Sequence, residues 1–150
     1  MIKILFVCHG NICRSPMAEF VLKDMVKKAG LEDQFDIASA ATSTEEIGNT
    51  VHPGTKRKLD SLGISTAGKR AVQMTATDYA VYDYLIGMDS ANIRNMKKIS
   101  GGDPDRKIWK LLDFAEGGDI TDPWYTGNFD LTYRDIYRGC RALLKKLVNK

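Results

Sequence analysis

The hydrophobic positions of the chain form short apolar runs that alternate with amphipathic stretches. Residues 2–7 are almost all apolar and are soon followed by Gly10, which is typical of a strand buried on both faces of a parallel sheet. Further short strands are predicted at residues 35–39, 82–86 and 108–112. None of these runs approaches the ~20 apolar residues that a membrane-spanning helix needs, so no membrane contact is expected.

Between the predicted strands, the apolar positions repeat with the period of a helix. Ser15 and Pro16 are typical of the N-cap and first position of a helix, and Gly30 is typical of its end. Glu19 belongs to the polar side of this predicted helix. The spacing is clearest in the last predicted helix, residues 129–147. Shorter helical segments are expected at residues 53–62, 77–79 and 89–98, and loops at residues 40–51 and 117–127.

Strands that alternate with helices predict an α/β fold. We expect a single domain over residues 1–150, with a four-stranded parallel sheet of the Rossmann or flavodoxin type between two layers of helices. Ligands of such sheets bind beyond the carboxyl ends of the strands. Two predicted strand ends carry polar residues, at residues 8–15 and at Met88–Asp89, so the functional site is expected there.

Composition and charge narrow the classes of function. Hydrophobic residues make up 43% of the 150 residues and charged residues 27%, which excludes a disordered chain. The net charge of +3 is too small to indicate nucleic-acid binding. Three cysteines and an N-terminus without a signal-peptide pattern favour a reducing cytoplasm, although secretion without a signal peptide stays open. Cys8 and Cys13 have no second cysteine pair, so no metal is expected.

The turn after the first strand carries the candidate chemistry. A helix start presents unpaired N–H groups and a partial positive charge, both of which favour an anion. Gly10 and Asn11 tolerate the left-handed backbone that a loop needs to wrap around one, and Arg14 offers a planar fork for two phosphate oxygens. Cys8 would lie at the base of this loop, where the same groups and the Ser15 hydroxyl stabilise its thiolate. A thiolate beneath a phosphoryl group is a nucleophile in line for attack.

A cysteine at the end of a strand is often only a packing residue. Here a buried strand, turn-forming residues and a Ser-Pro helix start coincide around the C-x5-R-S pattern. That coincidence favours a catalytic Cys8 and a phosphate-binding Arg14.

The segment VCHGNICRSPMAE resembles the signature of the low-molecular-weight protein tyrosine phosphatases. The resemblance continues at residues 39–41, at the M-D-x-x-N turn of residues 88–92 and at the D-P-aromatic acid loop of residues 122–125, so it covers nearly the whole chain. It implies a cysteine-dependent phosphotyrosine phosphatase that needs no cofactor. It also implies that Asp122 is the general acid and base of a two-step cycle through a phosphocysteine, with Pro123 stiffening its loop.

The resemblance implies roles for further residues. Substrate-binding roles are expected for His9, Gly10, Asn11, Ile12, Cys13, Ser15, Glu45, Trp124 and Tyr125, and supporting roles for Ser39 and Asp89. Asp89 is equally well read as a helix N-cap. Glu45 stands where eukaryotic members have an aromatic wall residue, and residues 67–70 lack their supporting His, so the chain resembles a bacterial member.

The three remaining cysteine and histidine assignments are less specific. A reversible disulfide between Cys8 and Cys13 follows from the resemblance, with a plain buried Cys13 as the alternative. Cys140 is expected in the core and His52 on the surface.

Three other functions stay open. A protein-arginine phosphatase shares the fold but typically has Thr where this chain has Ile12. An arsenate reductase needs further cysteines between Cys13 and Cys140, and the chain has none there. A non-catalytic phosphate-binding module would not need Asp122.

The expected partners are a phosphotyrosine protein, with a bacterial tyrosine kinase as one possibility, and phosphate or another oxyanion in the loop. A monomer is expected, and regulation through Tyr125 stays open.

Overall fold

The computed structural model describes residues 1–149. Its strands are β1 (Ile2–Cys8), β2 (Phe35–Ala41), β3 (Tyr84–Gly87) and β4 (Ile108–Lys110). Its helices are α1 (Arg14–Lys28), α2 (Pro53–Asp60), α3 (Ala76–Val81), α4 (Ser90–Ser100), α5 (Pro123–Thr126) and α6 (Phe129–Val148), with 3-10 turns at Glu32–Gln34 and Leu111–Phe114. The strands pair in parallel in the order β2-β1-β3-β4, which confirms the predicted fold class.

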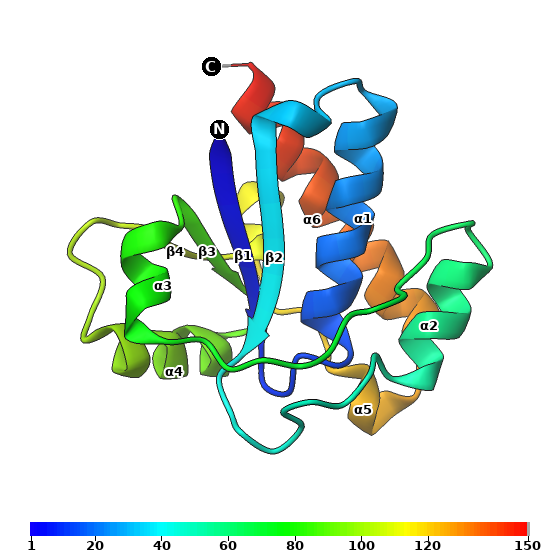
Figure 1. Ribbon diagram of the computed structural model, residues 1–150, viewed down its shortest axis with the longest axis horizontal. Coiled ribbons are helices and arrows are strands. Elements are labelled where there is room, and N and C mark those ends of the chain that lie inside the picture. The colour runs from blue at the N-terminus through cyan, green and yellow to red at the C-terminus, as the bar shows by residue number, and fades with distance from the viewer. Residues whose placement is uncertain (150) are drawn as a thin grey trace.

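Helices cover both faces of the sheet (Figure 1). Side chains of β1 alternate between the two faces: Ile4 and Phe6 pack in the cluster that includes α1 and α6, whereas Leu5 and Val7 pack in the cluster that includes α4. All four side chains are buried, and this explains why residues 4–7 form a continuous apolar run. Within the described residues, no helix combines the length and the apolar character needed to span a membrane.

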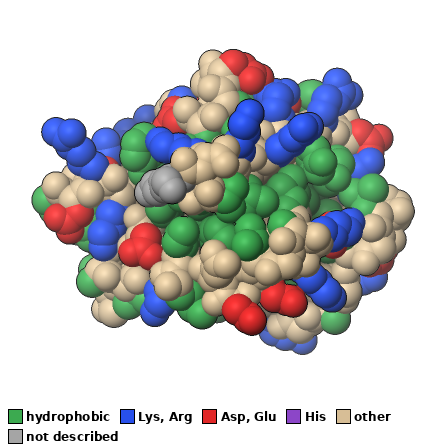
Figure 2. Space-filling view, turned by 90° about the horizontal axis from the view of Figure 1, so that it is seen from above, with side chains coloured by type: hydrophobic (Ala, Val, Ile, Leu, Met, Phe, Trp, Pro, Cys, Tyr) green, Lys and Arg blue, Asp and Glu red, His purple; other side chains and the backbone are tan. Residues whose placement is uncertain are grey.

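The two ends of the sheet differ in character. Figure 2 views the end where the strands begin, and there hydrophobic side chains gather between Lys and Arg residues. Ile2, Tyr84 and Trp109 line a depression at this end. The carboxyl ends of the strands lie at the bottom of Figure 1, where β1 leads into α1 and β3 into α4. Because the connections from β1 and β3 leave toward opposite faces, this end of the sheet opens into a crevice.

Several predicted boundaries were wrong by a few residues. The strand predicted at residues 35–39 continues to Ala41, and the strand predicted at 82–86 is β3. The one predicted at 108–112 ends at Lys110, where a 3-10 turn begins. Within the predicted loop 117–127, α5 forms because the Asp122 carboxylate accepts the Trp124 N–H and Pro123 has the backbone angle of a first helical residue.

The start of the first helix also differs from the prediction. Helix α1 begins at Arg14, its N-cap is Cys13, and no side chain caps it. Ser15 is therefore inside the helix, and its hydroxyl serves another residue, Cys8. The backbone N–H of Ser15 also points at the Cys8 sulfur, 3.4 Å away, so the free end of the helix faces the candidate nucleophile.

Candidate active site

The Cys8 sulfur lies at the base of the loop between β1 and α1. Cys8 is the last residue of β1 and only 3% of it is exposed. Asn11 has a φ of 59°, as predicted for a left-handed residue, and its N–H points back at the sulfur over 3.3 Å. Gly10 does not take such a φ; a side chain there would instead press on Glu46. The Cys8 sulfur thus accepts the N–H groups of both Asn11 and Ser15, which converge on it from the loop and from the start of α1.

A chain of buried hydrogen bonds holds the loop from below. The Asn11 amide donates to the hydroxyls of Ser15 and Ser39 over 2.8 and 2.9 Å, and its oxygen accepts the N–H of Val72. The Ser15 oxygen accepts from Asn11, so its own proton can point at the Cys8 sulfur, 3.0 Å away, or at the Ala40 carbonyl, 3.4 Å away. Asn11, Ser15 and Ser39 are buried behind the loop, and their side chains do not line the cavity above it.

Glu19 is the last residue of this chain of hydrogen bonds. The sequence predicted a solvent-facing side chain for it, and this prediction was wrong. It is 4% exposed and accepts the Ser39 hydroxyl over 2.6 Å. Lys23 and Lys69 pair with the Glu19 carboxylate, and these opposite charges offset the cost of burying it. Burial lowers the pKa of Lys69, whose ammonium also donates to the Ser39 carbonyl. Ser15 and Glu19 are four residues apart on one helix face, and this spacing was a signal that could have found Glu19.

Arg14 is anchored on three sides. Its guanidinium donates to Asp89 over 2.7 Å and to the Ile120 carbonyl over 2.8 Å, and lies 3.5 Å from the Asp122 carboxylate. Burial opposes its charge, yet its pKa is raised overall because Cys8, Asp89 and Asp122 favour the cation. Only 2% of Arg14 is exposed, so its plane is fixed at the base of the site.

Asp89 contacts both Arg14 and the start of α4, where it is the N-cap that was one of its two interpretations. One carboxylate oxygen binds Arg14, and the other accepts the Asn92 N–H at the start of α4 over 2.8 Å. The Asn92 side chain in turn accepts the N–H groups of Met88 and Asp89. Gly87 allows this close packing, since a side chain there would press on Asn92 and Met96. The turn after β3 is therefore a rigid support for Arg14.

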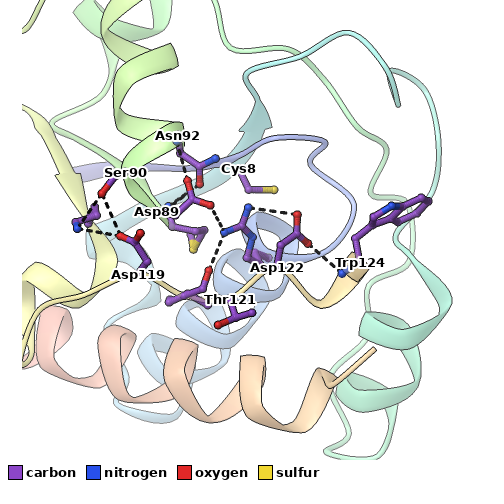
Figure 3. A network of polar contacts seen from close by, with 12 residues as sticks. Cys8, Asp89, Ser90, Asn92, Asp119, Thr121, Asp122 and Trp124 are labelled. Carbon is purple, nitrogen blue, oxygen red and sulfur yellow. Dashed lines mark hydrogen bonds and ion pairs between the residues drawn. The ribbon is translucent and has the colours of Figure 1, made fainter. Parts of the chain in front are cut away.

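Asp122 reaches the same site from the far end of the chain. It precedes α5, and one of its oxygens accepts the Trp124 N–H over 3.0 Å while the other faces Arg14. The Ile120 N–H binds the Met88 carbonyl over 2.9 Å, which fixes the loop to the end of β3. In Figure 3, dashed lines run from the Asp89 and Asp122 carboxylates into the space between them, and both carboxylates pair with Arg14. The structure thus brings together Cys8, Arg14 and Asp122, the three predicted catalytic residues.

A cavity of about 350 Å³ opens above these residues. Its lining residues are Cys8, His9, Gly10, Ile12, Cys13, Arg14, Glu45, Glu46, Asp122, Trp124 and Tyr125. Glu46 is the one of these that was not predicted from the sequence. One wall is aromatic, from the exposed Trp124 and Tyr125. Another part of the lining is acidic, from Glu45 and Glu46, and Glu45 pairs with His9 over 2.8 Å.

Cys13 and Cys140 are buried thiols. Burial, followed by the nearby Cys8, raises the pKa of Cys13 to about 12, so Cys13 is a protonated thiol at neutral pH. Burial also raises the pKa of Cys140, which lies on the buried face of α6, in the core, as predicted. Within residues 1–149, no three His, Cys, Asp or Glu side chains are grouped so as to hold a metal ion.

His52 is not the surface residue that the sequence predicted. Its ring stacks on Phe129, with centroids 5.1 Å apart, and meets Trp124 edge-on at 5.7 Å. No local signal distinguishes this position, because Phe129 and Trp124 lie more than 70 residues further along the chain.

Comparisons with known proteins show which family this chain resembles in sequence and fold. The family model for low molecular weight phosphotyrosine protein phosphatases matches residues 3–150. Low molecular weight protein-tyrosine-phosphatase YfkJ of Bacillus subtilis is 42% identical over 150 residues, which cover 98% of this chain and 96% of YfkJ. The crystal structure of YfkJ matches with a TM-score of 0.96 at 41% identity, over 99% of this chain and 96% of that one.

Two further solved structures have the same fold. SP-PTP, a low molecular weight protein tyrosine phosphatase from Streptococcus pyogenes, matches with a TM-score of 0.89 at 44% identity, over 98% of this chain and 93% of its own. DARP, a drosophila arginine phosphatase, matches with a TM-score of 0.88 at 28% identity, over 97% of this chain and 98% of its own.

Proposed function

Because the chain belongs to the low molecular weight protein tyrosine phosphatase family, we propose that it hydrolyses phosphotyrosine in proteins through a phosphocysteine formed on Cys8. The observation that carries this proposal is the convergence of a thiol, a buried guanidinium and a carboxyl group on one cavity. Cys8, Arg14 and Asp122 are the groups that nucleophilic attack, charge stabilisation and proton transfer require.

In the first step, the Cys8 thiolate attacks phosphorus. The S–P bond forms, the bond from phosphorus to the phenolic oxygen breaks, and the protonated Asp122 gives its proton to the leaving oxygen. Arg14 and the loop N–H groups hold the three equatorial oxygens, whose charge persists through the transition state. Asp89 and the Ile120 carbonyl keep the guanidinium in place, so no reorganisation is needed during the reaction.

In the second step, water attacks the phosphocysteine. The Asp122 carboxylate takes the proton of the water, the new P–O bond forms and the S–P bond breaks. Sulfur leaves as a thiolate, which the Ser15 hydroxyl and the N–H groups of Asn11 and Ser15 stabilise. Phosphate then leaves the loop, and the enzyme returns to its starting state without a cofactor.

The cavity walls favour an aryl phosphate. Ile12 and Trp124 offer apolar surfaces on which a phenyl ring can lie. Glu45 and Glu46 add negative charge where the residues beside the phosphotyrosine pass. A tyrosine-phosphorylated protein, of which a bacterial tyrosine kinase is one example, is the substrate that we propose for a monomeric enzyme.

Hydrolysis assays of the reduced protein test this function. With EDTA present, we expect release of phosphate from p-nitrophenyl phosphate and from a phosphotyrosine peptide, and much slower release from a phosphoarginine peptide of the same sequence. Faster turnover of phosphoarginine would keep the cysteine mechanism but replace the substrate class. Folded protein that binds phosphate without turnover would indicate a phosphate-binding module instead.

The role of Asp122 as general acid is tested by Asp122→Asn. An amide cannot give its proton to a phenolate, so we expect kcat/KM for phenyl phosphate to fall about 10²-fold or more. A good leaving group needs less help, so the loss for p-nitrophenyl phosphate should be clearly smaller.

The matched control is Asp119→Asn on the same loop, because Asp119 is half exposed and pairs with Lys110 outside the cavity. An equal loss for both substrates in Asp122→Asn would contradict the role of Asp122 as the acid.

A further inference from the structure

The acid loop is weakly held by its own structure. Helix α5 has four residues, and a single helical turn is unstable in isolation. Among its side chains only that of Pro123 is buried, while Trp124 is 57% and Tyr125 84% exposed. The position of Asp122, which directly precedes α5, therefore depends on contacts that other segments make with this loop.

Arg14 supplies such a contact on the inner side, and His52 supplies one on the outer side. The imidazole of His52 lies edge-on to the indole of Trp124 and stacks on Phe129, the first residue of α6. Trp124 and Phe129 flank the turn that joins α5 to α6, so one ring touches both sides of that turn. Gly54 leaves room for this arrangement, because a side chain there would collide with the Phe129 ring.

His52 is itself fixed to the nucleophile loop. Its backbone N–H donates to the Ile12 carbonyl over 2.9 Å, and Ile12 lines the cavity. Its ring nitrogen Nδ1 accepts the Gly54 N–H over 3.0 Å, which caps α2. Thr55, one turn along, donates to the Cys13 carbonyl over 3.3 Å. The His52 backbone is thus bound to the loop that follows Cys8, and its imidazole, fixed by Gly54, contacts the loop that carries Asp122.

We infer that His52 is a positioning residue that holds Trp124, and through it Asp122, at a fixed place opposite the nucleophile loop. Asp122 must reach the leaving oxygen while Cys8 attacks phosphorus, so both loops must keep one mutual geometry. The contact of His52 with Trp124 also holds the indole in the cavity lining, where we expect the substrate ring to pack. This inference rests on the proposed function for its kinetic consequence, but the contact itself can be tested without turnover.

The capping and the ring contact of His52 can be separated by two variants. In His52→Asn, the side-chain oxygen can still accept the Gly54 N–H, so α2 keeps its cap but the ring is lost. In His52→Phe, the ring remains and the acceptor is lost. Both are made in a Trp109→Phe background, because Trp109 and Trp124 are the two tryptophans of the chain and Trp109 lies at the opposite end of the sheet.

The readouts are leaving-group dependence and the fluorescence of Trp124. For His52→Asn we expect kcat/KM for phenyl phosphate to fall about 10-fold, and that for p-nitrophenyl phosphate to fall less, because Asp122 is displaced. Trp124 emission should shift to the red and its anisotropy should drop. His52→Phe should restore both readouts toward those of the parent, although α2 melts at a lower temperature.

A double-mutant cycle tests the inference even if His52→Asn alters folding, because it measures the coupling between His52 and Trp124. If His52 acts through Trp124, adding His52→Asn to Trp124→Ala should cause little further change in leaving-group dependence.

Three results would overturn the inference: equal losses for both substrates in His52→Asn, Trp124 emission unchanged in that variant, or additive effects in the cycle. If the parent protein has no phosphatase activity, the proposed function fails, and Trp124 emission alone then decides whether His52 holds the loop.

Discussion

Cys8→Ser is expected to reduce phosphatase turnover by about 10⁴-fold or more, the range seen when other enzymes lose a nucleophile. A serine hydroxyl occupies the same place but keeps its proton at neutral pH, and the contacts around Cys8 offer no base to remove it. The Ser15 hydroxyl and the N–H groups of Asn11 and Ser15 surround the sulfur, and none of them is a base at neutral pH. The site is built to stabilise an anion that sulfur can supply and a serine oxygen cannot.

Phosphate binding should survive this substitution. Arg14 and the loop N–H groups remain, so the affinity for inorganic phosphate, measured by calorimetry, should stay within a fewfold of the parent value. Cys140→Ala is the control, since this buried thiol of α6 packs against α1 away from the cavity and its loss should lower stability but preserve turnover. Turnover retained by Cys8→Ser, or no phosphorus on Cys8 in rapid-quench experiments with the parent, would contradict the phosphocysteine.

The nucleophile loop could be predicted from sequence because its determinants are contiguous. A buried strand, a residue that accepts a positive φ and a helix start follow one another within residues 2–16. Local backbone preference therefore specifies both the loop and the place of Cys8 at its base. The same holds for the order of strands and helices, since each element has its own apolar period.

The supports of the site could not be predicted in the same way. The partner of Arg14 at Ile120 is a backbone carbonyl, and its side chain gives no sign of that role. Glu19 was placed in solvent because a charged residue on a helix usually faces water, and only its pairing with Lys23 and Lys69 makes its burial possible. His52 depends on contacts across more than 70 residues. Such contacts arise from the packing of distant elements, which local patterns do not describe.

Arg14→Lys is the second substitution with a large expected effect, although it keeps the charge. The guanidinium binds Asp89 and the Ile120 carbonyl and lies near Asp122, while its fork remains directed at the cavity. A lysine ammonium is a point charge on a flexible stem, and it cannot bind these supports and two phosphate oxygens in one plane. We expect kcat/KM for p-nitrophenyl phosphate to fall about 10³-fold, as when other phosphoryl-transfer enzymes lose an arginine, and phosphate affinity to fall with it.

The stability of Arg14→Lys separates this explanation from general damage to the fold. Losing hydrogen bonds to the buried Ile120 carbonyl and to Asp89 should lower the free energy of unfolding by about 1–3 kcal/mol, which leaves a protein of this size folded. Arg134→Lys, an exposed position on α6, is the matched control and should change neither quantity. If Arg14→Lys kept the kcat/KM of the parent, positive charge alone would suffice, and the three-sided anchoring of Arg14 would have only a structural role. A loss confined to activity and phosphate affinity, with small change in stability, would instead show that the planar fork itself recognises the phosphoryl group.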